Sequence, residues 1–250
     1  MQAYLILVRR ELGALFKSWI GYVFLAGTMF LLNLSLVYLL GALRMEATPA
    51  PLTLLYFDTL FFWFVLLLMS PLITMRAFAM EKSTGTFETL MTTPVSDLQV
   101  VLAKFTGALV FFLVLWLPLL PCLLIVRHYS SDPSALVGGT IASTYLGILL
   151  IGCVYLSLGV FASALTRSQI VAAMVGFALG IPLFSVGFLG SMLPTQSGVV
   201  RQMVAHLKWM DHMSSFAQGV VDLRPIVLCL SLTVLFLFLA LKVVESRRWK

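Results

Sequence analysis

Six long apolar segments without a charged residue constrain this chain more than any other feature of its sequence. A helix needs about 20 mostly apolar residues to cross a lipid bilayer. The segments run roughly over residues 19–43, 59–75, 105–126, 135–166, 168–193 and 226–241. Only 10% of the residues are charged, against about 25% in a soluble domain. Membrane β-barrels are excluded because their strands alternate in hydrophobicity. The sequence therefore predicts an all-α polytopic membrane protein, a single domain over residues 1–250 with six transmembrane helices.

The basic residues predict how these helices are oriented. Six spans place both chain ends on one side, and that side holds eleven of the 16 Lys and Arg residues. The opposite side holds the other five, which five acidic residues balance. Because basic residues accumulate in cytoplasmic loops, we expect both termini in the cytoplasm. This sorting accounts for the net charge of +6, so we expect no nucleic-acid partner.

Two segments outside the spans have helical periodicity. Over residues 3–17, apolar side chains recur at helical spacing from Tyr4 to Phe16, which predicts an amphipathic helix at the membrane surface. Its Arg9 and Arg10 are placed to contact anionic lipids. In the long outer loop, residues 194–225, a helical face that ends at Gly219 is shared by Met203, Leu207, Met210, Ser214 and Ala217, with Trp209 and Phe216 nearby. This helix could lie on the outer membrane surface or dip back into it.

Prolines within the predicted spans indicate helix kinks. Pro118 and Pro121 lie in the third span and Pro182 in the fifth, where each removes a backbone hydrogen bond. Gly176 and Gly180 form a G-x-x-x-G match, which is weak evidence for a dimer face in a glycine-rich membrane chain.

No motif in the sequence indicates catalysis or cofactor binding. H-E-x-x-H, G-x-S-x-G and Walker-A patterns are missing from it, and no span carries a carboxylate. We therefore expect no catalytic residue, no bound cofactor and no metal. A lipid-processing membrane enzyme would have to use scattered outer-loop residues, namely His128, Asp132, His206 and Asp211.

The segment between the second and third spans carries the clearest local signals. The second helix can extend until Gly85, because glycine accepts the left-handed conformation that ends helices. A short helix over Thr84 to Thr93 should follow, because Thr84 to Thr86 can cap it, Glu88 is favourable in its first turn, and Pro94 should end it. Ser96 and Gln99 have the spacing of a capping box at the start of the next helix.

This short helix could serve as an interface for a cytoplasmic partner. Phe87, Leu90 and Met91 would be its apolar anchors, with Glu81, Lys82 and Glu88 as an ionic rim. If only the residues that would cap and end this helix are considered, an ordinary solvated loop is equally compatible with the sequence.

The same segment resembles a family signature. It reads M-R-x-x-x-x-E-K-x-x-G-T-F-E-T-L-x-x-x-P-V-S-D-x-Q-x-V-x-x-K from Met75 to Lys104. This run resembles that of type-2 ABC exporter permeases, and the resemblance extends over essentially the whole chain. The run from Phe216 to Asp222, F-x-x-G-V-V-D, is similar to the branch that contains the gliding-motility permease GldF and the copper-associated permease NosY.

The resemblance implies a permease subunit in the inner membrane of a bacterium. Two copies of a separate ATPase subunit would bind ATP and Mg²⁺, and a second permease chain would complete a homodimer or heterodimer. The coupling helix of the family falls on Thr84 to Thr93, and the turn at Arg167 would be a second, smaller contact. The implied coupling residues are Glu81, Lys82, Thr84, Gly85, Thr86, Phe87, Glu88, Leu90, Met91, Pro94 and Arg167. The alternative within this family is a subunit that transmits force to an outer-side partner without substrate flux.

Overall fold

The computed structural model describes residues 2–42, 52–57, 59–87, 95–129, 138–192 and 208–246. Every regular element in these ranges is a helix, as the apolar segments predicted. The helices are α1 (Gln2–Phe16), α2 (Trp19–Ala42), α3 (Leu52–Phe57), α4 (Leu60–Thr74), α5 (Ala79–Thr84), α7 (Asp97–Trp116), α8 (Leu119–Tyr129), α9 (Gly138–Leu165), α10 (Gln169–Met192), α12 (Trp209–Ala217) and α13 (Leu223–Ser246).

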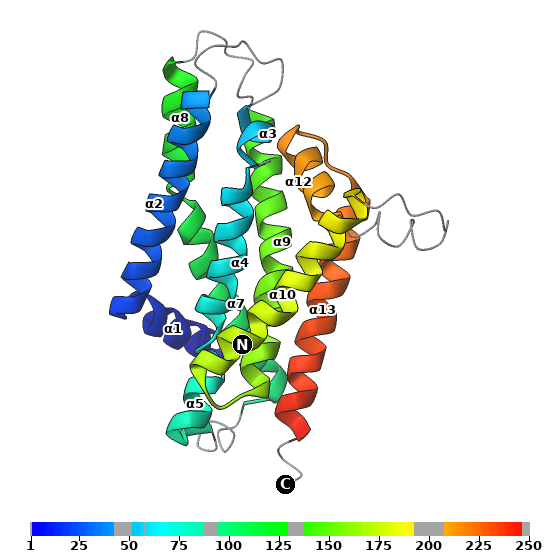
Figure 1. Cartoon of the computed structure of the whole chain (residues 1–250). Helices are drawn as coiled ribbons and strands as arrows, with labels where there is room; N and C mark the ends of the chain where they lie inside the picture. Colours follow the sequence, from blue (N-terminus) through cyan, green and yellow to red (C-terminus); the bar gives the residue numbers. More distant parts are fainter. Residues whose placement is uncertain are drawn as a thin grey trace.

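The long helices run side by side along a bundle (Figure 1). α5 and the last turn of α13 lie at one end, here named the α5 end, and α3 and α12 lie at the other. α1 crosses the bundle near the α5 end and packs on α7, where Phe16 and Phe111 meet edge to face with centroids 5.0 Å apart. The N-terminal helix predicted over residues 3–17 is therefore present, and it leads directly into α2.

Five helical segments are long and apolar enough to cross a membrane. They are Trp19–Gly41, Phe61–Ser83, Asp97–Ile125, Gly138–Leu165 and Leu223–Ser246. α10, which corresponds to the predicted span over 168–193, is helical over Gln169–Met192. Its part with described side chains, Gln169–Ser185, is shorter than a full span. The helical class of the fold is confirmed, whereas a sixth span stays a prediction.

α9 is the central helix of the bundle. In its most apolar stretch 83% of the residues are buried, against 28% in α2 and 17% in α13. Two glycines allow this close packing. A Cβ atom at Gly152 would lie 2.3 Å from the Phe112 ring, and one at Gly159 would lie 2.1 Å from Thr74 Oγ1. α7 and α4 thus approach α9 where it has no side chain.

The predicted kinks have different outcomes. α7 ends at Trp116, and α8 begins at Leu119 immediately after Pro118, so the predicted third span is interrupted there. Pro121 lies in the first turn of α8, where a missing N–H group is tolerated. Pro182 lies inside the continuous α10, and α4 contains a proline that was not singled out, Pro71.

The G-x-x-x-G glycines pack within the chain. A Cβ at Gly176 would lie 3.1 Å from Pro71 Cβ, and one at Gly180 would lie 3.5 Å from the Tyr155 ring. These two glycines therefore fit α10 against α4 and α9, so their pattern needs no dimer to explain it.

α12 presents a different face from the predicted one. Its buried residues are Trp209, Met213, Phe216 and Ala217, whereas the sequence pattern favoured Met210, Ser214 and Ala217. The large aromatic side chains decide the face because they bury more apolar area. Trp209 Nε1 donates to the Leu183 carbonyl at 2.9 Å, which ties α12 to α10. Gly219, with φ of 88°, follows the helix where its end was predicted.

Candidate functional site

The candidate site is the segment around α5, where the sequence signals concentrate. α4 ends at Thr74, a turn over residues 75–78 follows, and α5 ends at Thr84, where Gly85 caps it with φ of 73°. The left-handed glycine is thus confirmed, but the second helix is interrupted before it reaches this residue. Ser96 Oγ accepts from the Gln99 amide at 3.3 Å, and Gln99 Oε1 accepts from the Ser96 amide at 3.3 Å, which confirms the capping box.

The short helix predicted over Thr84 to Thr93 is described only at its beginning. Thr86 and Phe87 are helical. Glu88, Leu90, Met91 and Pro94 lie outside the described residues.

A serine of α9 fixes the start of α5. Ser163 Oγ accepts from the amides of Phe78 at 3.0 Å and Ala79 at 3.1 Å, and it donates to the Met75 carbonyl at 3.1 Å. These amides at the helix N-terminus have no partner within the helix, so the hydroxyl satisfies them. Lys82 Nζ donates to the Ala164 carbonyl, one residue further along α9. The exposed Arg167 follows in the turn between α9 and α10, so both predicted contact regions lie at the α5 end.

Four charged side chains form a closed ion ring that joins α5 to α1 and α7. Arg10 Nη2 lies 2.8 Å from Glu11 Oε1 and 2.7 Å from Glu81 Oε1. Lys104 Nζ lies 3.1 Å from Glu11 Oε1 and 2.9 Å from Glu81 Oε1. The Lys104 side chain is only 2% exposed. A buried charge is retained only when opposite charges and hydrogen bonds compensate for its lost hydration, and the two glutamates provide both.

The two glutamates of the ion ring stabilise the charge of Arg10. Burial lowers the pKa of Arg10, but its hydrogen bond and charge interaction with Glu11, together with those of Glu81, raise that pKa overall. Arginine is already protonated at any physiological pH, so Arg10 stays a cation. Arg10 therefore offers a cation to both glutamates at every such pH.

Two residues expected at an exposed interface are instead covered by the chain itself. Phe87 is 9% exposed and packs with Leu7, Phe78 and Val244 in a small core at the α5 end. Lys82 Nζ lies 5.4 Å from the Phe87 ring centroid, and Lys104 Nζ lies 5.2 Å from that of Phe78. Glu81, expected in an ionic rim, lies in the ion ring. In the described part of this segment, residues 83–86 stay exposed, and they form a small polar tip.

The threonines of this tip bond backwards to α5. Thr84 Oγ1 donates to the Met80 carbonyl at 3.0 Å, and the Thr84 and Thr86 hydroxyls lie 2.9 Å apart. Thr86 Oγ1 also donates to the Glu81 carbonyl at 3.5 Å. The sequence suggested that they cap the following helix, whereas the structure shows them closing the C-terminal end of α5.

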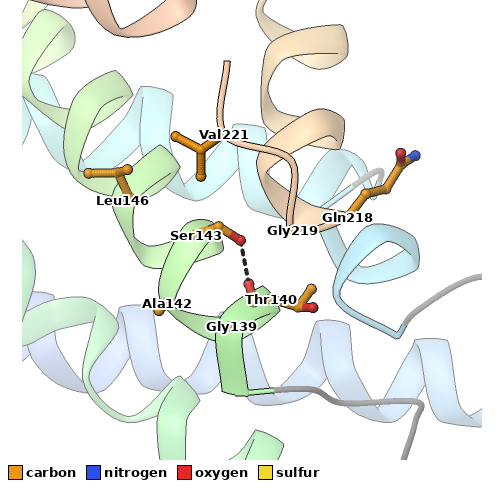
Figure 2. Close-up of a pocket in the computed structure, with 8 residues that line it drawn as sticks. All are labelled: Gly139, Thr140, Ala142, Ser143, Leu146, Gln218, Gly219 and Val221. Atoms are coloured by element: carbon orange, nitrogen blue, oxygen red, sulfur yellow. Dashed lines mark hydrogen bonds between the residues drawn. The ribbon is translucent and has the colours of Figure 1, made fainter. Parts of the chain in front are cut away.

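A cavity lies at the opposite end of the bundle, here named the α12 end. Figure 2 shows that it lies between the first turns of α9 and the segment after α12. Ser143 Oγ donates to the carbonyls of Thr140 at 3.0 Å and Phe216 at 2.7 Å. No charged residue is among its described lining, which is Gly139, Thr140, Ala142, Ser143, Leu146, Gln218, Gly219 and Val221. Among the described residues, no three His, Cys, Asp or Glu side chains group as a metal site would require.

Comparison with protein families identifies the chain. The family model described as ABC-2 family transporter protein matches residues 33–247. The chain belongs to the ABC-2 transporter family. A search among curated proteins found no match. ABC-2 permeases are in general non-catalytic membrane subunits that work with an ABC ATPase. The family, together with the five apolar helices, makes this chain a multi-pass membrane protein.

Proposed function

We propose that this ABC-2 protein is the permease subunit of an exporter, and that it couples ATP hydrolysis in a separate ATPase to substrate movement across the inner membrane of a bacterium. The observation that carries the proposal is the construction of the α5 segment. It presents an exposed polar tip at one end of the bundle, while α1, α7 and α9 hold its other side. A segment built in this way can receive a force at its tip and pass it to several helices.

The contacts around α5 suggest three routes for that force. Glu81 connects α5 to the buried Lys104 of α7. Arg10 connects it to α1, and Ser163 connects it to the end of α9. If the ATPase pushes on the tip, these contacts would move the three helices with α5 as a rigid body, which is the usual form of domain-scale switching.

The full assembly in this proposal contains two permease chains and two ATPases, which bind ATP and Mg²⁺. The permease would have six spans, with both termini and the α5 end in the cytoplasm. Large apolar side chains exposed on α2 and α13, such as Phe30, Tyr38 and Phe238, would face lipid or the second permease. The likeness to the GldF and NosY branch keeps an outer-side partner within the proposal.

Purification of the tagged chain from its host tests the ATPase contact. Mass spectrometry should find one Walker-A ATPase per permease in the native complex. Thr84→Arg enlarges the exposed tip and should release the ATPase. Gln218→Arg makes the same kind of change at an exposed position at the α12 end and should retain it. A native complex without any ATPase would contradict the proposal. An ATPase-containing complex that hydrolyses ATP but moves no substrate would instead favour force transmission.

A further inference from the structure

A cavity of about 680 Å³ opens between α1, the α4–α5 turn and α7. Its charged lining residues are Arg10, Glu11, Lys17, Arg76, Glu81 and Lys104. The ion ring pairs two of these cations with the two glutamates. Lys17 and Arg76 are left without an ion pair in the described part of the chain, so the cavity carries two cations in excess.

Two side chains that line this cavity each carry a buried polar atom without a hydrogen-bond partner. These atoms are Arg76 Nε, which is a donor, and Glu81 Oε2, which is an acceptor. A buried polar group without a partner is costly, so such groups are normally satisfied by protein, water or a ligand. One ligand that satisfies both atoms must accept a hydrogen bond at Arg76 and donate one at Glu81.

The uncharged lining is mostly apolar, with Ser18, Thr84 and Thr86 as its polar members, and it comes mainly from α1, α5 and two of the membrane-capable segments. Ile73 and Ala108 belong to the segments Phe61–Ser83 and Asp97–Ile125, and Leu15 lies at the end of α1. The neighbouring Trp19 is 88% exposed and Tyr22 is 60% exposed. Exposed Trp and Tyr side chains favour the interface between headgroups and acyl chains. In a membrane, these two side chains would place the cavity at headgroup level, with a charged part and an apolar part.

We propose that this cavity binds the headgroup of a membrane phospholipid. The phosphate would be held by Arg76 and Lys17, and a hydrogen-bond donor of the headgroup, an ammonium or a hydroxyl, would meet Glu81 Oε2. The apolar lining would take the beginning of the acyl chains. Because the bound lipid touches α1, α5 and α7, it would add a fourth link to the three contacts that hold the α5 segment. The proposal concerns lipid binding and stands independently of ATPase coupling.

Short-chain lipids that differ in headgroup test the proposal on the purified, delipidated full-length chain. Dihexanoyl phosphatidylethanolamine and phosphatidylglycerol carry a donor group, whereas dihexanoyl phosphatidylcholine carries none. Binding is read by native mass spectrometry and by ligand-induced thermal stabilisation. We expect the two donor lipids to bind about tenfold more tightly than phosphatidylcholine, the factor expected for one charge-assisted hydrogen bond. Inorganic phosphate alone should bind more weakly than either.

Variants assign the binding to this cavity. Arg76→Gln should lower the affinity for the donor lipids by about tenfold or more. Lys17→Gln should act in the same direction, and because Lys17 is exposed this variant should fold like the parent chain. Arg224→Gln removes an exposed arginine at the α12 end and serves as the control.

Three results would overturn the proposal. Equal binding of all three lipids would exclude recognition of the headgroup donor. Unchanged lipid binding in both Arg76→Gln and Lys17→Gln would show that the lipid binds elsewhere on the chain. Inorganic phosphate that binds as tightly as the lipids and competes with them would make this a site for free phosphate. Each readout is independent of ATP hydrolysis, so failure here leaves the proposed permease function standing, and the reverse also holds.

Discussion

Lys104 Nζ lies 2.9 Å from Glu81 Oε1, and this contact joins the first half of α7 to α5 across the segment that resembles the coupling helix of ABC-2 permeases. The lysine side chain is 2% exposed, whereas that of Arg10 on the opposite corner of the ion ring is 47% exposed. The two cations therefore contribute differently. Lys104 depends on the two glutamates for its compensation, while Arg10 can still be hydrated.

Lys104→Met tests this dependence. The substitution fills the space but leaves Glu11 and Glu81 with one cation, and breaking a buried pair costs about 3–5 kcal/mol. We expect a lower unfolding temperature in detergent and earlier proteolysis near α1. Lys242→Met is the control, because Lys242 pairs with Glu245 at 2.7 Å on an exposed surface, where such pairs contribute about 0–1 kcal/mol. Equal effects of the two variants would contradict a structural role for the ion ring.

Ser163→Ala tests how α5 is fixed to α9. The change leaves the amides of Phe78 and Ala79 without an acceptor, at a cost of about 1–3 kcal/mol. Hydrogen exchange should then become faster over α5. Ser157→Ala is a matched control in the same helix with the same burial, because Ser157 Oγ only donates to the Val154 carbonyl of its own helix. Exchange over α5 that stays slow in Ser163→Ala would show that another contact holds this helix.

Gly159→Ala tests the close packing of α9. An added Cβ would lie 2.1 Å from Thr74 Oγ1, and overpacking of this kind costs about 1–3 kcal/mol. Thermal unfolding should show the loss, and Thr74→Ala in the same chain should restore part of it. Gly27→Ala, in the open space around α2, should instead be neutral or stabilising by up to about 1 kcal/mol. Additive effects of Gly159→Ala and Thr74→Ala would argue against this contact.

Local sequence signals predicted local structure well. Gly85 ends its helix and Ser96 caps the next because each effect depends on residues only a few positions away. The long helices followed from uninterrupted apolar segments. The buried face of α12 shares only Ala217 with the predicted one, because spacing alone does not weigh the size of Trp209 and Phe216.

The candidate site could be predicted only in part, because its contacts join distant segments. Lys104 and Glu11 are 93 positions apart, and nothing in the local pattern pairs them. One signal was available, since Lys104 lies on the same helical face as Val100, Val101 and Ala108, and a cation among buried apolar residues requires a counter-ion. Ser163 gave no signal, because a serine in an apolar helix is ordinary. Phe87 was expected at the surface because the residues that cover it belong to α1 and α13. Both helices are far from Phe87 in the sequence, so the local pattern does not show this contact.

Gly85→Pro and Gly85→Asn test whether the backbone conformation at Gly85 determines binding of the ATPase to the α5 tip. The backbone at Gly85 has φ of 73°, which proline cannot adopt, since its ring fixes φ near about −65°. Asparagine tolerates the left-handed conformation. Proline should therefore redirect the tip and reduce the ATPase recovered with the permease by about tenfold, a loss of about 1.4 kcal/mol, while asparagine should retain it. Both variants should unfold near the parent temperature, because the tip is exposed. Equal ATPase recovery from the two would mean that the direction of the tip does not determine the contact.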